Sequence, residues 1–302
     1  MIDVSIIIVN YNTKKLLKDC ITSIYRNTKD IQFEIIVSDN GSIDGSTEMI
    51  KNDFPQVILI KNTKNIGFGA ANNRGLAIAR GKYVFYLNSD TVLLNNAAKF
   101  FFDFWENFHN PYLLGAIGAN LLDENGKITY SYGNFFKFSD DVLFFIKKYL
   151  RLILLSIGIK KHSRNNPSIK KFVGEVDIII GADLFMKNDD FARFDEYFFL
   201  YHEEADLEYQ LLLNKKLRIL IDGPKIIHFQ GKSESQIIHN KEFRNYCSFS
   251  KINDYISKVK FYKKNYNYYI YVFILKFLIL LIWLFPPLIP YTRKYIRELL
   301  LV

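Results

Sequence analysis

The sequence predicts an α/β fold, in which a mainly parallel sheet is flanked by helices and followed by an apolar, helical, membrane-associated C-terminal segment. Short β-branched runs alternate with helix-length stretches in the first third of the chain, an alternation typical of βαβ units and a parallel sheet. The expected strands are 4–9, 33–38, 57–61 and 83–87, and the expected helices are 14–27, 44–52 and 69–79. The run Ile6-Ile7-Ile8-Val9 is continuously apolar, as expected for a strand covered on both faces.

The composition excludes a disordered or fibrous chain. Of 302 residues, 49 % are hydrophobic, with 27 Phe and 20 Tyr, enough for a large core. The formal net charge of +9 indicates a polyanionic partner: nucleic acid, an anionic membrane or a phosphorylated substrate. Cys20 and Cys247 lie far apart with no His cluster nearby, which favours reduced thiols. The apolar N-terminus lacks a basic leader and a cleavage site, and we expect a strand there.

Polar residues follow the expected strands and predict a site at one edge of the sheet. They are Asn10-Tyr11-Asn12, Asp39-Asn40-Gly41-Ser42 and Asn88-Ser89-Asp90. Ligands of parallel sheets bind beyond the carboxyl ends of the strands, so these clusters should converge. Asp39 could accept a hydrogen bond from a nucleobase imide, with Asn10 and Asn12 framing the base. An ordinary Asp-Asn-Gly turn is the alternative.

Two further segments could contact a diphosphate. The Gly-rich stretch 65–75 enters an expected helix, whose N-terminal amides could hold phosphate oxygens, or it is a plain tight turn. It is neither a P-loop nor a GxGxxG fingerprint. Asp90 is placed to hold a divalent cation that bridges a diphosphate, since Mg²⁺ binds through one or two carboxylates plus substrate phosphates. A helix N-cap is the alternative for Ser89 and Asp90.

The densest acidic cluster is His202-Glu203-Glu204-Ala205-Asp206. Crowded carboxylates among aromatic residues should have raised pKa values, which suits a general base, although a charged first helical turn is the alternative. His228 follows a short strand-like run and is a candidate metal ligand or a structural histidine.

The C-terminal part predicts membrane association. Residues 268–285 are almost continuously apolar, prolines follow, and Lys and Arg lie on both sides. This run is near the length of a spanning helix, and the prolines permit a helix that enters the bilayer and returns; a buried helix is the alternative. Residues 142–159 suit an interfacial helix or a core helix. We expect an exposed basic loop at 160–167.

Seven segments together resemble glycosyltransferase family 2, with its GT-A fold, over roughly residues 3–230. The style is most similar to the rhamnosyltransferase-like branch that builds bacterial surface polysaccharides. The segments, in order, are Val4–Asn12, Val37–Ser46, Asn65–Gly75, Leu87–Asp90, Gly181–Asp183, Phe194–Leu207 and Ile226–His228.

The resemblance implies an inverting, metal-dependent transfer of a sugar from a UDP- or dTDP-sugar to a lipid-linked saccharide. Glu204 would be the catalytic base, with Glu203 and Asp206 as alternates. Mg²⁺ or Mn²⁺ would be held by Asp90 and His228, and weakly by Asn88. The nucleotide would contact the residues Val9, Asn10, Tyr11, Asn12, Asp39, Asn73 and Ser89.

The resemblance and the basic, apolar C-terminal pattern together predict the organisation and location of the chain. Residues 1–98 would bind the nucleotide-sugar, 99–240 would bind the acceptor and carry the metal and base residues, and 241–302 would bind the membrane, at the cytoplasmic face of the inner membrane. Two departures stand out: Asn88 replaces the first Asp of the family's DXD-type motif, and Glu204 is one methylene longer than the usual Asp.

Two alternatives remain open from the sequence. A nucleotidyltransferase also needs a metal-binding acid, but it usually carries an N-terminal Gly-rich loop that Asn10-Tyr11-Asn12-Thr13 lacks. A non-catalytic relative could bind membrane. Nucleic acid is not expected as a partner, because the positive charges lie near residue 160 and beside the apolar tail, not along a nucleic-acid motif.

Overall fold

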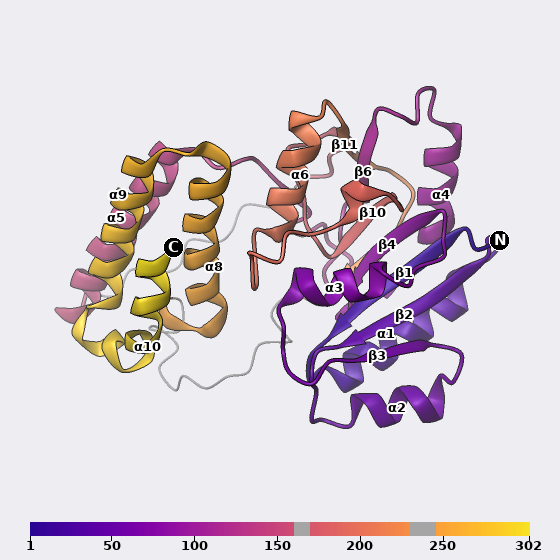
Figure 1. Ribbon diagram of the computed structural model, residues 1–302, viewed down its shortest axis with the longest axis horizontal. Coiled ribbons are helices and arrows are strands. Elements are labelled where there is room, and N and C mark those ends of the chain that lie inside the picture. The colour runs from indigo at the N-terminus through magenta and orange to yellow at the C-terminus, as the bar shows by residue number, and fades with distance from the viewer. Residues whose placement is uncertain (160–169, 230–245) are drawn as a thin grey trace. The chain divides into compact units, whose positions relative to one another are not determined.

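The computed structural model describes residues 1–159, 170–229 and 246–302 (Figure 1). The predicted basic loop at 160–167 lies outside the described residues. The chain divides into two compact units, which are described separately below. The first, the sheet unit, comprises Met1–Phe135, Ser168–Phe199 and Glu203–Ser233. The second, the helical unit, comprises Phe136–Pro167, Leu200–His202 and Glu234–Val302.

An eight-stranded, mostly parallel sheet forms the centre of the sheet unit, in the order β3-β2-β1-β4-β10-β6-β11-β8. β1, β2, β3 and β4 run parallel, β10 is antiparallel to β4 and β6, and β11 is parallel to β6. The strands are β1 (Val4–Asn10), β2 (Phe33–Asp39), β3 (Ile58–Lys61), β4 (Tyr83–Asn88), β6 (Leu114–Ala119), β8 (Gly174–Glu175), β10 (Asp183–Lys187) and β11 (Leu217–Ile221).

Alternate residues of the central strands enter two hydrophobic clusters, one on each face of the sheet. Ile6 and Ile8 belong to one cluster, whereas Ile7 belongs to the other, and all three are fully buried. This period of two follows from the pleat, and it explains why a strand covered on both faces is apolar throughout. The covering helices are α1 (Lys14–Asn27), α2 (Ser46–Asp53), α3 (Phe68–Leu76), α4 (Ala97–Asn107) and α6 (Glu203–Leu213).

Two short ribbons complete the sheet unit. β5 (Thr91–Leu93) pairs with β12 (Ile226–His228), and β7 (Tyr132–Gly133) pairs with β9 (Ile178–Ile179), both antiparallel. The β5–β12 ribbon joins the segment after β4 to a segment more than a hundred residues later, which positions a candidate site residue, His228.

The entry to α3 requires glycine. Gly67 has φ +94°, and a Cβ there would lie 2.4 Å from the Phe199 carbonyl oxygen, which accepts a hydrogen bond from the Phe68 amide. We expect Gly67→Ala to lower the free energy of unfolding by about 2–3 kcal/mol, from a left-handed backbone plus a steric overlap. Denaturant unfolding measures this. Gly126→Ala, with φ +74° and open space around the new Cβ, should cost less; equal losses would contradict the overlap.

The helical unit packs its helices around a second core (Figure 1). They are α5 (Phe138–Ser156), α8 (Phe249–Phe261), α9 (Tyr269–Trp283) and α10 (Ile289–Leu301), with short helical turns at Tyr262–Tyr266 and Pro286–Leu288. In the described ranges no single helix is long and apolar enough to cross a membrane. The pair Tyr269–Trp283 and Pro286–Leu301, bent by 85°, passes that test together, by length and composition only.

The predicted α/β class and the large, mostly parallel sheet flanked by helices are confirmed, and the four predicted N-terminal strands lie within one residue of β1–β4. The unit boundaries differ from the predicted division at 98 and 240, because β6, β10 and β11 extend the same sheet beyond residue 98. The predicted roles of residues 1–98, 99–240 and 241–302 stay predictions.

Candidate active site

Asn10 and Asp39 end neighbouring parallel strands and lie against each other. The Asn10 Nδ2 donates to Asp39 Oδ1 at 2.7 Å and to Ser42 Oγ at 2.9 Å, and the Ser42 amide donates to the other Asp39 oxygen at 3.0 Å. Asp39 is 2 % exposed. This network fixes the Asp39 carboxylate at the carboxyl edge of the sheet, where the sequence predicts contact with a nucleobase.

Thr13 connects this pair to the end of β4. Its hydroxyl donates to Asn10 Oδ1 at 2.6 Å and shares a 2.9 Å hydrogen bond with Ser89 Oγ. The polar clusters after β1, β2 and β4 therefore converge at one edge, as expected from the sequence. Ser42 belongs to one of these predicted clusters, whereas Thr13 does not; the only signal in the sequence for Thr13 is that it is polar and closely follows a strand.

Asp90 and His228 lie side by side. The β5–β12 ribbon sets His228 opposite Thr91, and the Phe229 amide donates to the Asp90 carbonyl at 2.9 Å. The Asp90 Oδ1 is 3.3 Å from His228 Nε2, and both residues are largely buried, at 6 % and 9 % exposed. A carboxylate and an imidazole thus meet beside the hydrogen-bond network of Asn10, Thr13 and Ser89.

The side chains at this edge fit a divalent cation that shares its coordination with substrate phosphates. Oxygen ligands suit Mg²⁺ and Mn²⁺, and imidazole adds a transition-metal ligand. In the part of the chain that the structure describes, His228 Nδ1 and Asn88 Oδ1 are buried without a hydrogen-bond partner, so both atoms could accept a further polar contact. Among the described residues, no group of three or more His, Cys, Asp or Glu side chains forms a ready cation site. A cation here would therefore depend on the diphosphate for further ligands.

The acidic cluster forms the first turn of α6, as the alternative interpretation of its sequence also expected. Glu203 is 3 % exposed and Asp206 1 % exposed, whereas Glu204 is partly exposed. Burial, and secondarily the charge of Glu204, holds the pKa of Glu203 well above its usual range. A Cβ at Gly181 would lie 3.9 Å from the Glu204 carboxyl carbon, so Glu204 lies beside the loop that precedes β10.

The sheet edge and that loop are linked by the backbone. The Asn88 amide at the end of β4 donates to the Ala182 carbonyl at 3.1 Å. Asp183 is fully buried, and desolvation raises its pKa, although its Oδ2 accepts from the Ala119 amide at 2.8 Å. The loop that contacts Glu204 is thus bonded, at its last residue Ala182, to the end of the strand that carries Asn88.

Buried Glu208, on α6, predicts a pH dependence of stability. It is fully buried, burial raises its pKa well above the usual range, and both carboxylate oxygens accept from the Ile179 amide. The folded chain therefore binds more protons than the unfolded chain above about pH 4.3, the pKa of an unfolded Glu. The free energy of unfolding should fall as pH rises from there toward the raised pKa.

Glu208→Gln should reduce this slope by up to about 1.4 kcal/mol per pH unit, because the amide carries no proton to lose. Urea unfolding at a series of pH values from 5 to 8 checks it. The control is Glu298→Gln, at an exposed position of α10. Parallel curves for wild type and Glu208→Gln would contradict the prediction.

The remaining predicted nucleotide contacts are placed as follows. Tyr11 is 46 % exposed and Val9 is partly buried. Asn12 adopts φ 54° and accepts from the Ile43 amide at 2.8 Å. Asn73 donates to the Phe194 carbonyl at 2.9 Å and accepts from the Phe194 amide at 3.0 Å, so its amide holds the segment that leads toward α6. The nucleotide contact predicted for Asn73 stays a prediction.

The Gly-rich stretch is a tight turn into α3. The Asn40 side chain donates to Asn65 Oδ1 at 2.9 Å and to the Gly67 carbonyl at 3.1 Å, and accepts from the Ile66 amide at 3.1 Å. Asn40 therefore holds the turn against the end of β2. Phosphate binding by this turn stays a prediction.

The mixed α/β sheet with its polar carboxyl edge defines a fold consistent with GT-A transferases. Residues 5–151 match the family profile described as "Glycosyl transferase family 2". The chain is 36 % identical over 154 residues to an uncharacterized glycosyltransferase, MJ1057, of Methanocaldococcus jannaschii, which covers 49 % of this chain and 52 % of that protein. Over about the first half of its length, the chain is therefore similar to glycosyltransferase family 2.

Two other similarities extend this result. A poly(ribitol-phosphate) beta-glucosyltransferase of Bacillus spizizenii is 29 % identical over 119 residues, 38 % of this chain and 19 % of that protein. These matches span about half, or less, of the relatives' length. The structure of the mannosyltransferase PcManGT from Pyrobaculum calidifontis, in complex with GDP-Man and Mn²⁺, superposes with a TM-score of 0.54 at 14 % identity, covering 98 % of this chain and 74 % of that one. This likeness shows the shared fold.

Proposed function

We propose that the chain is an inverting, metal-dependent glycosyltransferase that moves a sugar from a UDP- or dTDP-sugar to a lipid-linked saccharide during bacterial surface polysaccharide synthesis. One observation carries the proposal: the Asn10–Asp39 pair and the Asp90–His228 pair lie at or just beyond strand ends of the sheet unit, and the carboxylates in the first turn of α6 belong to the same unit. The family match and the poly(ribitol-phosphate) beta-glucosyltransferase name of the Bacillus spizizenii relative support it, as does the rhamnosyltransferase-like style of the motifs.

Each residue would act through chemistry that its position allows. Asp39, held by Asn10 and the Ser42 amide, would accept the imide hydrogen that uracil and thymine share. Asp90 and His228, with weak help from Asn88, would hold Mg²⁺ or Mn²⁺. When bound, the cation would supply Lewis-acid stabilisation to the departing nucleoside diphosphate.

Glu204 is the best-placed base among the α6 carboxylates. A base must be ionised and reach the acceptor hydroxyl. Glu203 is nearly inaccessible, and burial raises its pKa well above the usual range, which favours its neutral form, whereas Glu204 is partly exposed. Glu204 would take the hydroxyl proton as the oxygen attacks the anomeric carbon, and this single displacement inverts the configuration.

The test is binding and hydrolysis of UDP-, dTDP- and GDP-sugars by purified protein, with and without Mn²⁺. We expect thermal stabilisation and slow hydrolysis with a pyrimidine donor, both dependent on metal. Absence of any donor effect would refute the proposal, and release of pyrophosphate from a nucleoside triphosphate would indicate a nucleotidyltransferase instead.

The helical unit is proposed to bind the cytoplasmic face of the inner membrane. Apolar side chains are exposed on α5 and α9, and Lys147, Arg151, Lys263 and Arg293 are exposed on this unit. Apolar surface interleaved with basic residues suits an interface with anionic lipid. The exposed apolar residues of α5 and α9 include Leu143, Phe144, Leu150, Ile153, Ile270, Phe273 and Phe277.

We expect the purified chain to co-sediment with vesicles that contain anionic lipid, and the double variant Phe273→Glu with Phe277→Glu to lose most of this binding, because each charge opposes insertion. Leu94→Glu, at an exposed apolar position of the sheet unit, is the control. Unchanged sedimentation of the α9 variant would contradict the proposal.

A further inference from the structure

The three residues Leu200–His202, which precede α6 and the proposed base, belong to the helical unit although the residues on both sides of them belong to the sheet unit. Phe199 belongs to the sheet unit, Leu200–His202 belongs to the helical unit, and the chain returns to the sheet unit at Glu203, the first residue of α6. Glu204, the proposed base, therefore lies two residues after a segment that another unit holds.

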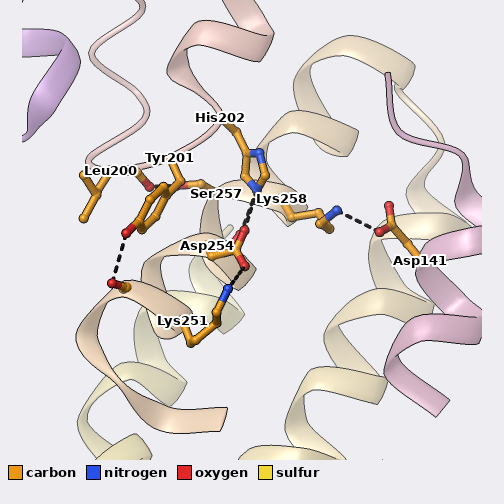
Figure 2. Close-up of polar contacts among 9 residues, drawn as sticks. Asp141, Leu200, Tyr201, His202, Lys251, Asp254, Ser257 and Lys258 are labelled. Atoms are coloured by element: carbon orange, nitrogen blue, oxygen red, sulfur yellow. Dashed lines mark hydrogen bonds and ion pairs between the residues drawn. The ribbon is translucent and has the colours of Figure 1, made fainter. Parts of the chain in front are cut away.

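Each of these residues makes a hydrogen bond to α8 (Figure 2). The Ser257 hydroxyl donates to the Leu200 carbonyl at 2.8 Å, the Tyr201 hydroxyl donates to Ser250 Oγ at 3.0 Å, and His202 Nε2 lies 2.9 Å from Asp254 Oδ1. The α8 partners, Ser250, Asp254 and Ser257, follow helical spacing and so share one face. We call Leu200–His202 the clasp.

The backbone of the clasp is held in an unfavourable conformation. Tyr201 has φ 68° and His202 has φ 67°, both in the left-handed region that residues with a Cβ rarely adopt. Two consecutive residues of this kind persist only where surrounding contacts over-determine them, and such strain gathers at functional sites. The bonds to α8 are those contacts.

Asp254 is fixed in its charged form. Burial alone would raise its pKa, but the hydrogen bond and charge of His202, with Lys251 and Lys258, hold the pKa below its usual range. Lys251 Nζ is 3.3 Å from Asp254 Oδ2. The His202 ring also packs edge-on against Phe136, with ring centroids 4.8 Å apart. The histidine is thus held on two sides within the helical unit.

We propose that His202 and Asp254 are positioning residues: the bonds of the clasp to α8 hold the left-handed backbone that leads directly into the first turn of α6, and so restrict the Glu204 carboxylate. The inference rests on the proposed role of Glu204. It extends the function to the helical unit, which would then determine the transfer rate as well as membrane contact. The donor-side network of Asn10, Thr13 and Asp39 has its own bonds within the sheet unit, so donor binding should not depend on the clasp.

The test compares Asp254→Asn and His202→Ala with wild type in donor affinity and transfer rate. We expect kcat for transfer to fall on the order of 10- to 100-fold, as for a base misplaced by about 1 Å, with the donor KM nearly unchanged. His202→Gln, which keeps a side-chain donor, should recover part of the rate. The double variant Asp254→Asn with His202→Ala should lose little more than either single variant.

The matched control is Asp141→Asn. Asp141 is 8 % exposed in the same unit and forms a 2.7 Å ion pair with Lys258 (Figure 2), but makes none of the three bonds between the clasp and α8. Asp141→Asn should perturb the helical unit but lower kcat less than Asp254→Asn does. The positioning role would be overturned if Asp141→Asn lowered kcat as much as Asp254→Asn does. It would also be overturned if the clasp variants only raised the donor KM and left kcat unchanged.

A readout independent of activity separates this inference from the proposed function. Amide hydrogen exchange of residues 203–206 should be faster in Asp254→Asn than in wild type and Asp141→Asn. Unchanged exchange would refute the inference even if the enzyme transfers sugar. Faster exchange in a protein that binds no nucleotide-sugar would support the clasp while refuting the proposed function.

Discussion

Asp90→Asn should lower metal-dependent sugar transfer by roughly 10²- to 10³-fold, the size of effect expected when one electrostatic contact to developing charge is removed. The carboxylate is 6 % exposed and lies 3.3 Å from His228 Nε2. The amide keeps the shape of the side chain but removes the negative charge that a divalent cation needs. The measurement is the initial transfer rate as a function of Mn²⁺ concentration.

The control for Asp90→Asn is Asp103→Asn on α4. Asp103 also belongs to the sheet unit and forms an ion pair with Lys99, but on the surface. Its replacement should leave the rate and the Mn²⁺ dependence unchanged. If Asp90→Asn transfers at the wild-type rate with the same Mn²⁺ response, Asp90 does not hold the cation.

Glu204→Gln should lower kcat for transfer by about 10²- to 10⁴-fold, the contribution of a positioned general base. Donor binding should stay within about threefold of wild type, because the change removes an interaction made mainly in the transition state. Steady-state kinetics with a supplied acceptor, paired with donor titration by calorimetry, measure both quantities.

Glu203→Gln is the neighbouring control for Glu204→Gln. Because burial and the charge of Glu204 raise the pKa of Glu203 and so favour its neutral form, an amide of the same shape should change kcat far less. The reverse pattern, with Glu203→Gln inactive and Glu204→Gln active, would assign the base to Glu203. Asp206→Asn tests the remaining alternate in the same assay.

The sheet could be predicted from local sequence because its strands are buried on both faces. Ile6, Ile7 and Ile8 point alternately to two cores, so the whole run is apolar, and the polar residues that follow mark the edge. The local sequence is enough to predict such a strand, because burial on both faces requires an apolar residue at each position. The convergence of Asn10, Asp39 and Ser89 could be predicted from the rule that parallel strands end at one edge.

The contacts that complete the site could not be predicted this way. His228 is brought to Asp90 by the pairing of β5 with β12. Each of these strands has three residues, too few to show a periodic pattern in the sequence. The clasp depends on left-handed backbone at Tyr201 and His202, which the sequence does not signal because neither residue is Gly or Asn. Such features depend on packing between distant segments.

The most direct test of the account is a crystal of the protein with UDP and Mn²⁺, measured for anomalous scattering at the manganese edge. The account predicts one strong peak within coordinating distance of Asp90 and His228, with the uracil imide on Asp39. A peak elsewhere, or UDP bound without contact to Asp39 and Asp90, would contradict the metal-dependent nucleotide-sugar site.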